Sequence, residues 1–179
     1  MKAAYYDPNP VVMLEHKGLY WSKIKGTEEA KNIEPDSNYI LPFGKAHKLV
    51  SADTTIKNSL TIVTYGMGVY WAKTVEQDFK GQLNILDLRT LFPLDEELIY
   101  ETVKSSGKCL VVTEEPESNS FAQSLAAKIS YSCFRFLDAP VTVIGAENLP
   151  AIPLNAVLES TMLPNAEKVK IAIKKLLEF

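Results

Sequence analysis

LTIVTYG (60–66) is the first of four short runs rich in Val, Ile and Leu; the others are NILDLRT (84–90), KCLVVTEE (108–115) and PVTVIG (140–145). Each of the first three is followed by a segment long enough to form a helix. Strands that alternate with helices form βαβ units, and such units build a largely parallel sheet covered by helices on both faces. The sequence therefore predicts an α/β fold over this region.

The segments between these runs carry helix signals. Apolar residues recur at helical spacing over about 68–79, and Asp95 lies where a helix cap is expected. The polar triplet SNS opens another helix over about 118–134. The stretch 147–163 is predicted to be irregular because of its prolines, and a last helix is predicted from about 164.

The N-terminal third does not follow this pattern. Residues 7–10 (DPNP) predict a turn, because proline blocks a helix and Asn and Asp favour tight bends, and VVML (11–14) predicts a buried strand after it. A turn followed by a single strand indicates that residues 1–26 are the tail of a preceding domain. Residues 27–58 show no sustained periodicity and predict a linker. The α/β domain is then expected over 59–179.

Charge and cysteine content exclude several classes of protein. The net charge of −3 argues against a nucleic-acid-binding protein, because phosphate binding requires a concentrated basic face. No apolar run approaches the roughly 20 residues that cross a bilayer, and the N-terminus has no signal-peptide pattern. Cys109 and Cys133 belong to no CxxC pair and predict buried, reduced thiols. We therefore expect a cytoplasmic protein.

A glycine turn after the first run allows two interpretations. Gly66-Met67-Gly68 between a strand and a helix is the start of a phosphate-binding pattern. Position 71 is Trp, where that pattern requires Gly or Ala. A tight strand-to-helix turn therefore explains the glycines better than a nucleotide site.

An acidic cluster ends the third run. Glu114, Glu115 and Glu117 are residue types used for acid/base catalysis or for metal binding, but no His, Cys or Asp lies near them in the sequence. An acidic loop that caps a helix or contacts a partner is the favoured interpretation. If one of the three is buried at an interface, we expect it to be Glu114, because it directly extends the strand.

No catalytic residue is assigned from the sequence. His16 and His47 are the only histidines, and neither lies in a nucleophile-and-base pattern. For His16 a structural or interface role is favoured over one near a substrate or cofactor. Asp7 and Asn9 carry oxygens that suit a hard cation, although a turn motif also explains them. An α/β domain without its own site indicates one half of a larger assembly.

Several blocks resemble the late part of the beta subunit of the thiamine-diphosphate-dependent, decarboxylating component of 2-oxoacid dehydrogenases. They are PNPVV (8–12), EHKGLY (15–20), LPFGKA (41–46), TIVTYG (61–66), DLRTLFPLD (87–95) and GKCLVV (107–112) with Glu114 and Pro116. The resemblance implies a three-layer α/β/α sandwich of the transketolase C-terminal type, whose mostly parallel sheet includes one antiparallel strand. It also implies that residues 1–26 end a pyrimidine-binding domain.

The resemblance places the chemistry outside this chain. The parent enzyme would decarboxylate a 2-oxoacid with thiamine diphosphate and magnesium and pass the acyl unit to a lipoyl group, whereas this chain alone is expected to hold no cofactor. Asp7 and Asn9 match part of a structural monovalent-cation site, which potassium would fill. Phe179 matches the C-terminal end that docks the dihydrolipoyl acyltransferase core. The other expected partners are the remainder of the decarboxylating component and a second copy of the chain.

The substrate stays open between two 2-oxoacids. The stretch SNSFA (118–122), Ser124 and Trp21 depart from the common pattern of the family, and they resemble a subgroup in which the alpha and beta parts are fused. We expect 2-oxoisovalerate first and pyruvate next. The alternatives are the C-terminal domain of a transketolase or of a deoxyxylulose-phosphate synthase, and a free-standing binding module.

Overall fold

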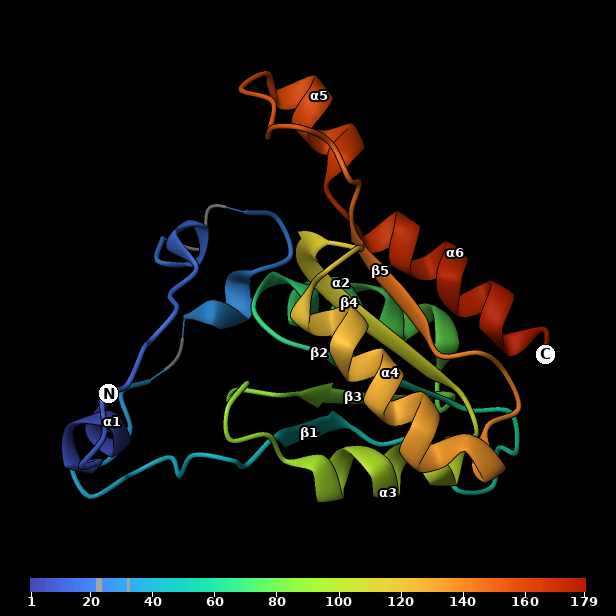
Figure 1. The fold of residues 1–179 in the computed structure, drawn as a ribbon, viewed down its shortest axis with the longest axis horizontal. Coiled ribbons are helices and arrows are strands. Elements are labelled where there is room, and N and C mark those ends of the chain that lie inside the picture. The colour runs from blue at the N-terminus through green and yellow to red at the C-terminus, as the bar shows by residue number, and fades with distance from the viewer. Residues whose placement is uncertain (22–23, 32) are drawn as a thin grey trace.

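A five-stranded sheet forms the centre of the domain in the computed structural model, which describes residues 1–21, 24–31 and 33–179 (Figure 1). The strand order is β1-β3-β2-β4-β5. Four strands are parallel: β2 (Leu60–Thr64), β3 (Leu83–Asp87), β4 (Cys109–Pro116) and β5 (Thr142–Ala146). At one edge, β1 (His47–Val50) pairs with β3 in the antiparallel direction. The mostly parallel sheet with one antiparallel strand is therefore confirmed.

Strand β2 lies at the centre of the sheet and is buried along its whole length. Its register aligns Leu60 with Leu83 of β3 and Thr61 with Cys109 of β4. A central parallel strand is covered by helices on both faces, so its sequence does not alternate between buried and exposed residues. This is the physical reason why LTIVT contains no charged residue, and its two threonines are buried with their hydroxyls hydrogen-bonded.

Helices cover both faces and give three layers (Figure 1). On one face, α2 (Met67–Glu76) and α6 (Ala166–Leu177) pack over a core that includes Ile62. On the other face, α3 (Glu96–Ser106) and α4 (Phe121–Cys133) pack over a core that includes Val63. Successive strand residues point to opposite faces, so adjacent residues of β2 enter separate cores.

Four helices of the domain, α2, α3, α4 and α6, begin and end close to where the sequence predicts. The N-terminal caps are side chains that accept a backbone N–H: Asp95 from Leu98 at 3.4 Å, Ser120 from Gln123 at 3.1 Å and Asn165 from Lys168 at 2.9 Å. Gly107 ends α3 with φ of 71°, a left-handed conformation that favours glycine. The expected helix over 68–79 is observed as α2 followed by the short 3-10 helix η3 (Gln77–Phe79).

Two expectations about local structure were wrong. Residues 11–14 form no strand, and Val12 and Leu14 are largely exposed, because no neighbouring strand lies there to pair with them. The segment 27–58, expected to be a linker, contains η2 (Glu28–Ala30) and the edge strand β1. The stretch 147–163, expected to be irregular, contains α5 (Ala156–Met162), which Asn155 caps. Short elements of this kind carry too few residues for periodicity to reveal them.

The remaining elements are short. They are α1 (Lys2–Tyr6), η1 (Lys17–Leu19) and η4 (Phe134–Phe136). Cys109 and Cys133 are both buried and unpaired, as expected. None of the helices described in the structure has the length and apolar character needed to cross a membrane.

Candidate functional site

The carboxyl ends of β2 and β4 lie side by side, which brings Tyr65 against the acidic end of β4. The Tyr65 hydroxyl lies 2.8 Å from Thr113 Oγ1 and donates a hydrogen bond to the Glu115 carboxylate. The other oxygen of Glu115 accepts the backbone N–H of Phe121 at 2.8 Å, in the first turn of α4. Glu115 therefore serves α4 and Tyr65, in agreement with the helix-capping interpretation of the acidic cluster.

Burial, and next the hydrogen bond to Glu115, raises the pKa of the Tyr65 hydroxyl above its ordinary value. The protonated phenol is the form that can donate to a carboxylate. This arrangement holds a proton in place and gives no general base. The network therefore has a structural role at the carboxyl end of the sheet.

We predict that Tyr65→Phe destabilises the chain by about 1–3 kcal/mol, because it leaves part-buried acceptors without their donor. The raised pKa of Tyr65 also makes the free energy of unfolding depend on pH. Above about pH 10 the unfolded chain loses the tyrosine proton before the folded chain does, so stability falls as the pH rises. Urea unfolding between pH 8 and 11 should show a smaller alkaline loss in the variant, and an unchanged loss would contradict the assignment.

Glu114, the next residue along β4, contacts the N-terminal part of the chain. His16 Nε2 lies 3.3 Å from Glu114 Oε1 and 3.2 Å from Oε2, and both side chains are partly buried. The two residues are 98 positions apart, and each was selected from the sequence without being paired with the other. His16 Nδ1 is buried without a hydrogen-bond partner among the described residues. The contact fixes segment 15–19 against the domain.

Replacing His16 by alanine should release this segment. We expect amide exchange over 15–19 to speed up at least tenfold, while global stability falls by no more than about 1 kcal/mol, because the pair is part-exposed. Hydrogen–deuterium exchange measures the first effect and urea unfolding the second. His47→Ala, at the exposed start of β1, is the matched control. Unchanged exchange over 15–19 would show that other contacts hold the segment.

The glycine turn after β2 supports the packing interpretation instead of a phosphate cradle. Gly66 has φ of 57°, which a residue with a side chain rarely adopts. A side chain at Gly68 would overlap Thr64 Oγ1, which itself donates to the Val112 carbonyl at 2.9 Å. The second glycine therefore lets α2 approach the sheet closely.

Asp7 and Asn9 lie together at the end of α1. Asp7 Oδ1 accepts the backbone N–H of Asn9 at 2.9 Å and its side-chain Nδ2 at 3.0 Å. A cation would need the oxygen of the Asn9 amide, which faces away from Asp7. Within residues 1–21, 24–31 and 33–179, no group of three or more His, Cys, Asp or Glu side chains could hold a metal ion. Asp7 and Asn9 therefore form a turn in the structure. A cation could use both side chains only after the Asn9 amide had rotated to present its oxygen.

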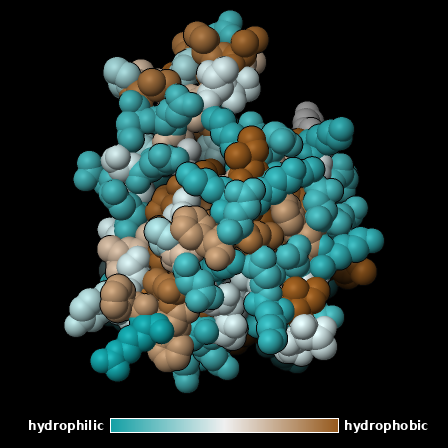
Figure 2. Space-filling model, turned by 90° about the vertical axis from the view of Figure 1, so that its right-hand side faces the viewer, coloured by the Kyte–Doolittle hydropathy of each residue, from teal (hydrophilic) through white to brown (hydrophobic). Residues whose placement is uncertain are grey.

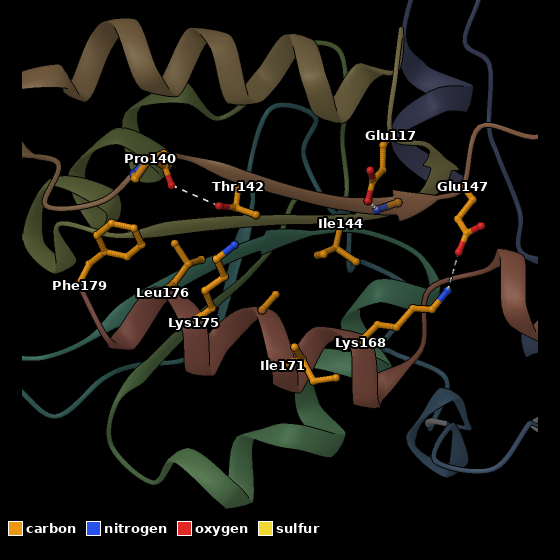
Figure 3. Close-up of a pocket in the computed structure, with 12 residues that line it drawn as sticks. Glu117, Pro140, Thr142, Ile144, Glu147, Lys168, Ile171, Lys175, Leu176 and Phe179 are labelled. Carbon is orange, nitrogen blue, oxygen red and sulfur yellow. Dashed lines mark hydrogen bonds and ion pairs between the residues drawn. The ribbon is translucent and has the colours of Figure 1, made fainter.

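Phe179 lines an open cavity of about 570 Å³ between β5 and α6, which we call the β5–α6 groove (Figure 3). Its apolar lining comes from both walls: Pro140 and Ile144 from the strand side, and Ile171, Leu176 and Phe179 from the helix side. Lys168 reaches across one end to Glu147, with Nζ and Oε1 3.8 Å apart. The charged side chains of the lining are Glu117, Glu147, Lys168 and Lys175. The mostly apolar lining gives the groove the character of a binding surface.

Residues 51–169 match the family described as the transketolase C-terminal domain. The chain is similar to the 2-oxoisovalerate dehydrogenase subunit beta of Bacillus subtilis (strain 168), with 35% identity over 182 residues. It is also similar to the pyruvate dehydrogenase E1 component subunit beta of Rhizobium meliloti (strain 1021), with 32% identity over 177 residues. The resemblance to beta subunits of 2-oxoacid dehydrogenases is thus confirmed.

The alignments cover all or nearly all of the chain but only part of each relative. They span 100% of the chain and 52% of the Bacillus protein, and 97% of the chain and 36% of the Rhizobium protein. A solved structure described as a split gene transketolase, an inactive beta4 tetramer, has a TM-score of 0.59 and 19% identity, and the match covers 77% of this chain and 44% of that one. At that identity the likeness shows the fold alone.

Proposed function

Because this chain belongs to the family of transketolase C-terminal domains, we propose that it is the assembly and docking domain of a 2-oxoacid dehydrogenase decarboxylating component. The observation that carries the proposal is the match along the full chain to a 2-oxoisovalerate dehydrogenase beta subunit. The geometry agrees, because Glu114, Glu115 and Tyr65 at the carboxyl ends of the strands serve internal contacts. The parent enzyme would decarboxylate the 2-oxoacid and pass the acyl unit to a lipoyl group.

Thiamine diphosphate and magnesium belong to the parent enzyme in this proposal. The residues present in this chain do not fit that cofactor: the glycines at 66 and 68 serve a tight turn, and the described side chains offer no metal-binding group. No step of the reaction is assigned to them. The role of this chain is to pack against the cofactor-binding parts and to present the β5–α6 groove.

The predicted result for catalysis is that the isolated chain does not turn over substrate. With thiamine diphosphate, magnesium and 2-oxoisovalerate, release of carbon dioxide should equal that of the buffer blank, because in this proposal the cofactor-binding parts lie outside this chain, which matches 52% of the Bacillus relative. A complete 2-oxoisovalerate dehydrogenase is the positive control. Turnover by the isolated chain would refute the proposal.

Docking to the dihydrolipoyl acyltransferase core is proposed to use Phe179. Phe179 is 65% exposed at the end of the groove, next to Leu176 and close to Lys175 in sequence. Removing Phe179 should weaken binding to the purified acyltransferase core at least tenfold, since it removes an aromatic anchor. Tyr131→Ser, which removes an exposed aromatic from α4, is the control. Equal affinity of the truncated chain would exclude this docking mode.

We propose 2-oxoisovalerate as the substrate of the parent, with pyruvate as the alternative. The support is the 35% identity to the Bacillus 2-oxoisovalerate subunit, against 34% for the pyruvate dehydrogenase beta subunit of Rickettsia bellii. Comparing the rates of the complete parent with the two acids decides between them. The monovalent-cation site of Asp7 and Asn9 is also a proposal, supported by the Asp7 carboxylate beside Asn9, whose amide would have to rotate to turn its oxygen toward the ion.

A further inference from the structure

Residues 147–163 form an arm that projects away from the sheet and contains α5 (Figure 1). Within the arm, Met162 is the one buried residue. Val157 and Leu158 of α5 are 72% and 56% exposed, and Figure 2 shows apolar side chains at the surface of the arm, at the top of the view. The helix α5 therefore gains little stability from packing.

A helix as short as α5 does not stay folded by itself. It has 7 residues, whereas isolated helices shorter than about 12–15 residues are marginal in water. Its N-terminal end has a local cap, since Asn155 Oδ1 accepts the N–H of Val157 at 2.9 Å and that of Leu158 at 3.3 Å. One cap does not offset the conformational entropy that is lost when the segment is ordered. The fold of α5 must then depend on contacts at its other end.

The C-terminal end of α5 is closed by groups from outside the helix. Lys168, in the first turn of α6, donates from Nζ to the Thr161 carbonyl at 2.6 Å and to the Leu163 carbonyl at 3.0 Å. The Met162 carbonyl accepts the backbone N–H of Glu147 at 3.1 Å. Carbonyls at a helix C-terminus have no partner within the helix, so these donors supply what α5 lacks. The positive charge of Lys168 also lies at the end of the helix where the dipole favours it.

The Lys168 amine joins the two ends of the arm to α6. Besides the two carbonyls near the end of the arm, its Nζ lies 3.8 Å from Glu147 Oε1 at the start of the arm (Figure 3). An ammonium group has three N–H donors, and here two carbonyls and one carboxylate face it. A single side chain of α6 therefore holds both ends of the arm together.

We propose that the arm is a conditionally folded element and that the Lys168 amine is the latch that holds it. With the latch closed, α5 is helical and the arm keeps one direction relative to the sheet. When the amine is neutralised or drawn to another acceptor, two carbonyls lose their donor, α5 unfolds and the arm moves about its two ends. The sheet keeps its fold, because the arm contributes only Met162 to the buried residues. This conformational device goes beyond the proposed docking function.

Hydrogen–deuterium exchange of Lys168→Met tests the latch. Methionine keeps most of the side-chain length and removes the charge and the donors. We expect exchange over 156–163 to speed up at least tenfold, whereas exchange over 60–64 in β2 stays the same. Lys174→Met, at an exposed position of the same helix, is the matched control and should change neither. Unchanged exchange over 156–163, an equal increase in the control, or an increase that extends to β2 would overturn the inference.

Lys168→Arg separates the charge and donors from other effects of the substitution. Arginine keeps both, so exchange over 156–163 should stay within threefold of the unmodified chain. A loss of protection as large as in Lys168→Met would show that the charge and the donors do not hold α5.

The direction of the arm is measured separately. The native cysteines are buried, so thiols introduced by Leu154→Cys in the arm and Tyr131→Cys on α4, both at exposed positions, can be spin-labelled. We expect a narrow distribution of distances between the labels when Lys168 is present, and one at least twice as wide after Lys168→Met. Equal widths would overturn the latch. Neither measurement uses the acyltransferase core, so a failure of the docking proposal would leave both results unchanged.

Discussion

Replacing Ile62 by alanine is expected to lower the free energy of unfolding by about 2–5 kcal/mol. Ile62 is fully buried in the middle of β2, with Ile85 of β3 and Leu110 of β4 as its neighbours in the ladders. Removing three carbons there loses their transfer free energy and leaves a cavity that three hydrogen-bonded strands cannot close. We expect this substitution to lower stability more than Tyr65→Phe or His16→Ala, because it opens a cavity in the core.

Urea unfolding followed by circular dichroism measures this effect as a lower midpoint with an unchanged slope. The matched control is Ile171→Ala, which removes the same atoms from a position 58% exposed on α6 and should change stability by no more than about 0.5 kcal/mol. A loss at Ile62 no greater than the loss at Ile171 would mean that β2 is not the centre of the core.

Gly68→Ala should destabilise the chain by about 3 kcal/mol. At an ordinary helix position this change gains about 1 kcal/mol in helix propensity, so the expected sign is reversed. The reason is the overlap of the new methyl group with Thr64 Oγ1, and its approach to 3.3 Å from the Val112 carbonyl oxygen. Thr64 is fully buried, so its side chain cannot move aside into solvent.

A double-mutant cycle separates this overlap from other effects. Thr64→Ala alone should cost about 1 kcal/mol for its lost hydrogen bond to Val112. In the double variant the space vacated by the threonine accepts the new methyl group, so the combined loss should be smaller than the sum by about 1–2 kcal/mol. Additive losses would show that the close approach of α2 to β2 is not the reason for a glycine at 68.

The layered fold followed from local patterns because each pattern has a single physical meaning. The uncharged run of β2, rich in β-branched residues and without polar–apolar alternation, fits a strand covered on both faces, and Asp95 before an apolar stripe fits a helix cap. Strand β1 and helix α5 escaped prediction because each is too short to show a period. The prediction of a buried strand at 11–14 (VVML) was wrong, because an apolar run forms a strand only where a neighbouring strand supplies hydrogen bonds.

The sequence predicted which residues belong to the candidate site, but it did not predict which of them contact each other. The sequence selected Glu114 and His16 separately, since a residue that extends a strand and a histidine after an apolar run are each recognisable. Their pairing joins positions 98 apart, and local spacing carries no signal at that distance. The same holds for Tyr65 and Glu115, which meet because parallel strands end at the same edge of the sheet.

The sequence by itself determined the α/β architecture, the approximate boundaries of α2, α3, α4 and α6, and the family, because these depend on periodicity, capping and motifs that are read along the chain. Only the tertiary structure decided the use of each polar side chain: Glu115 caps α4, Glu114 holds His16, and Phe179 borders the β5–α6 groove. It also decided that the arm at 147–163 stands exposed. The physical reason is that burial and pairing join residues distant in sequence, and only the packed chain brings them together.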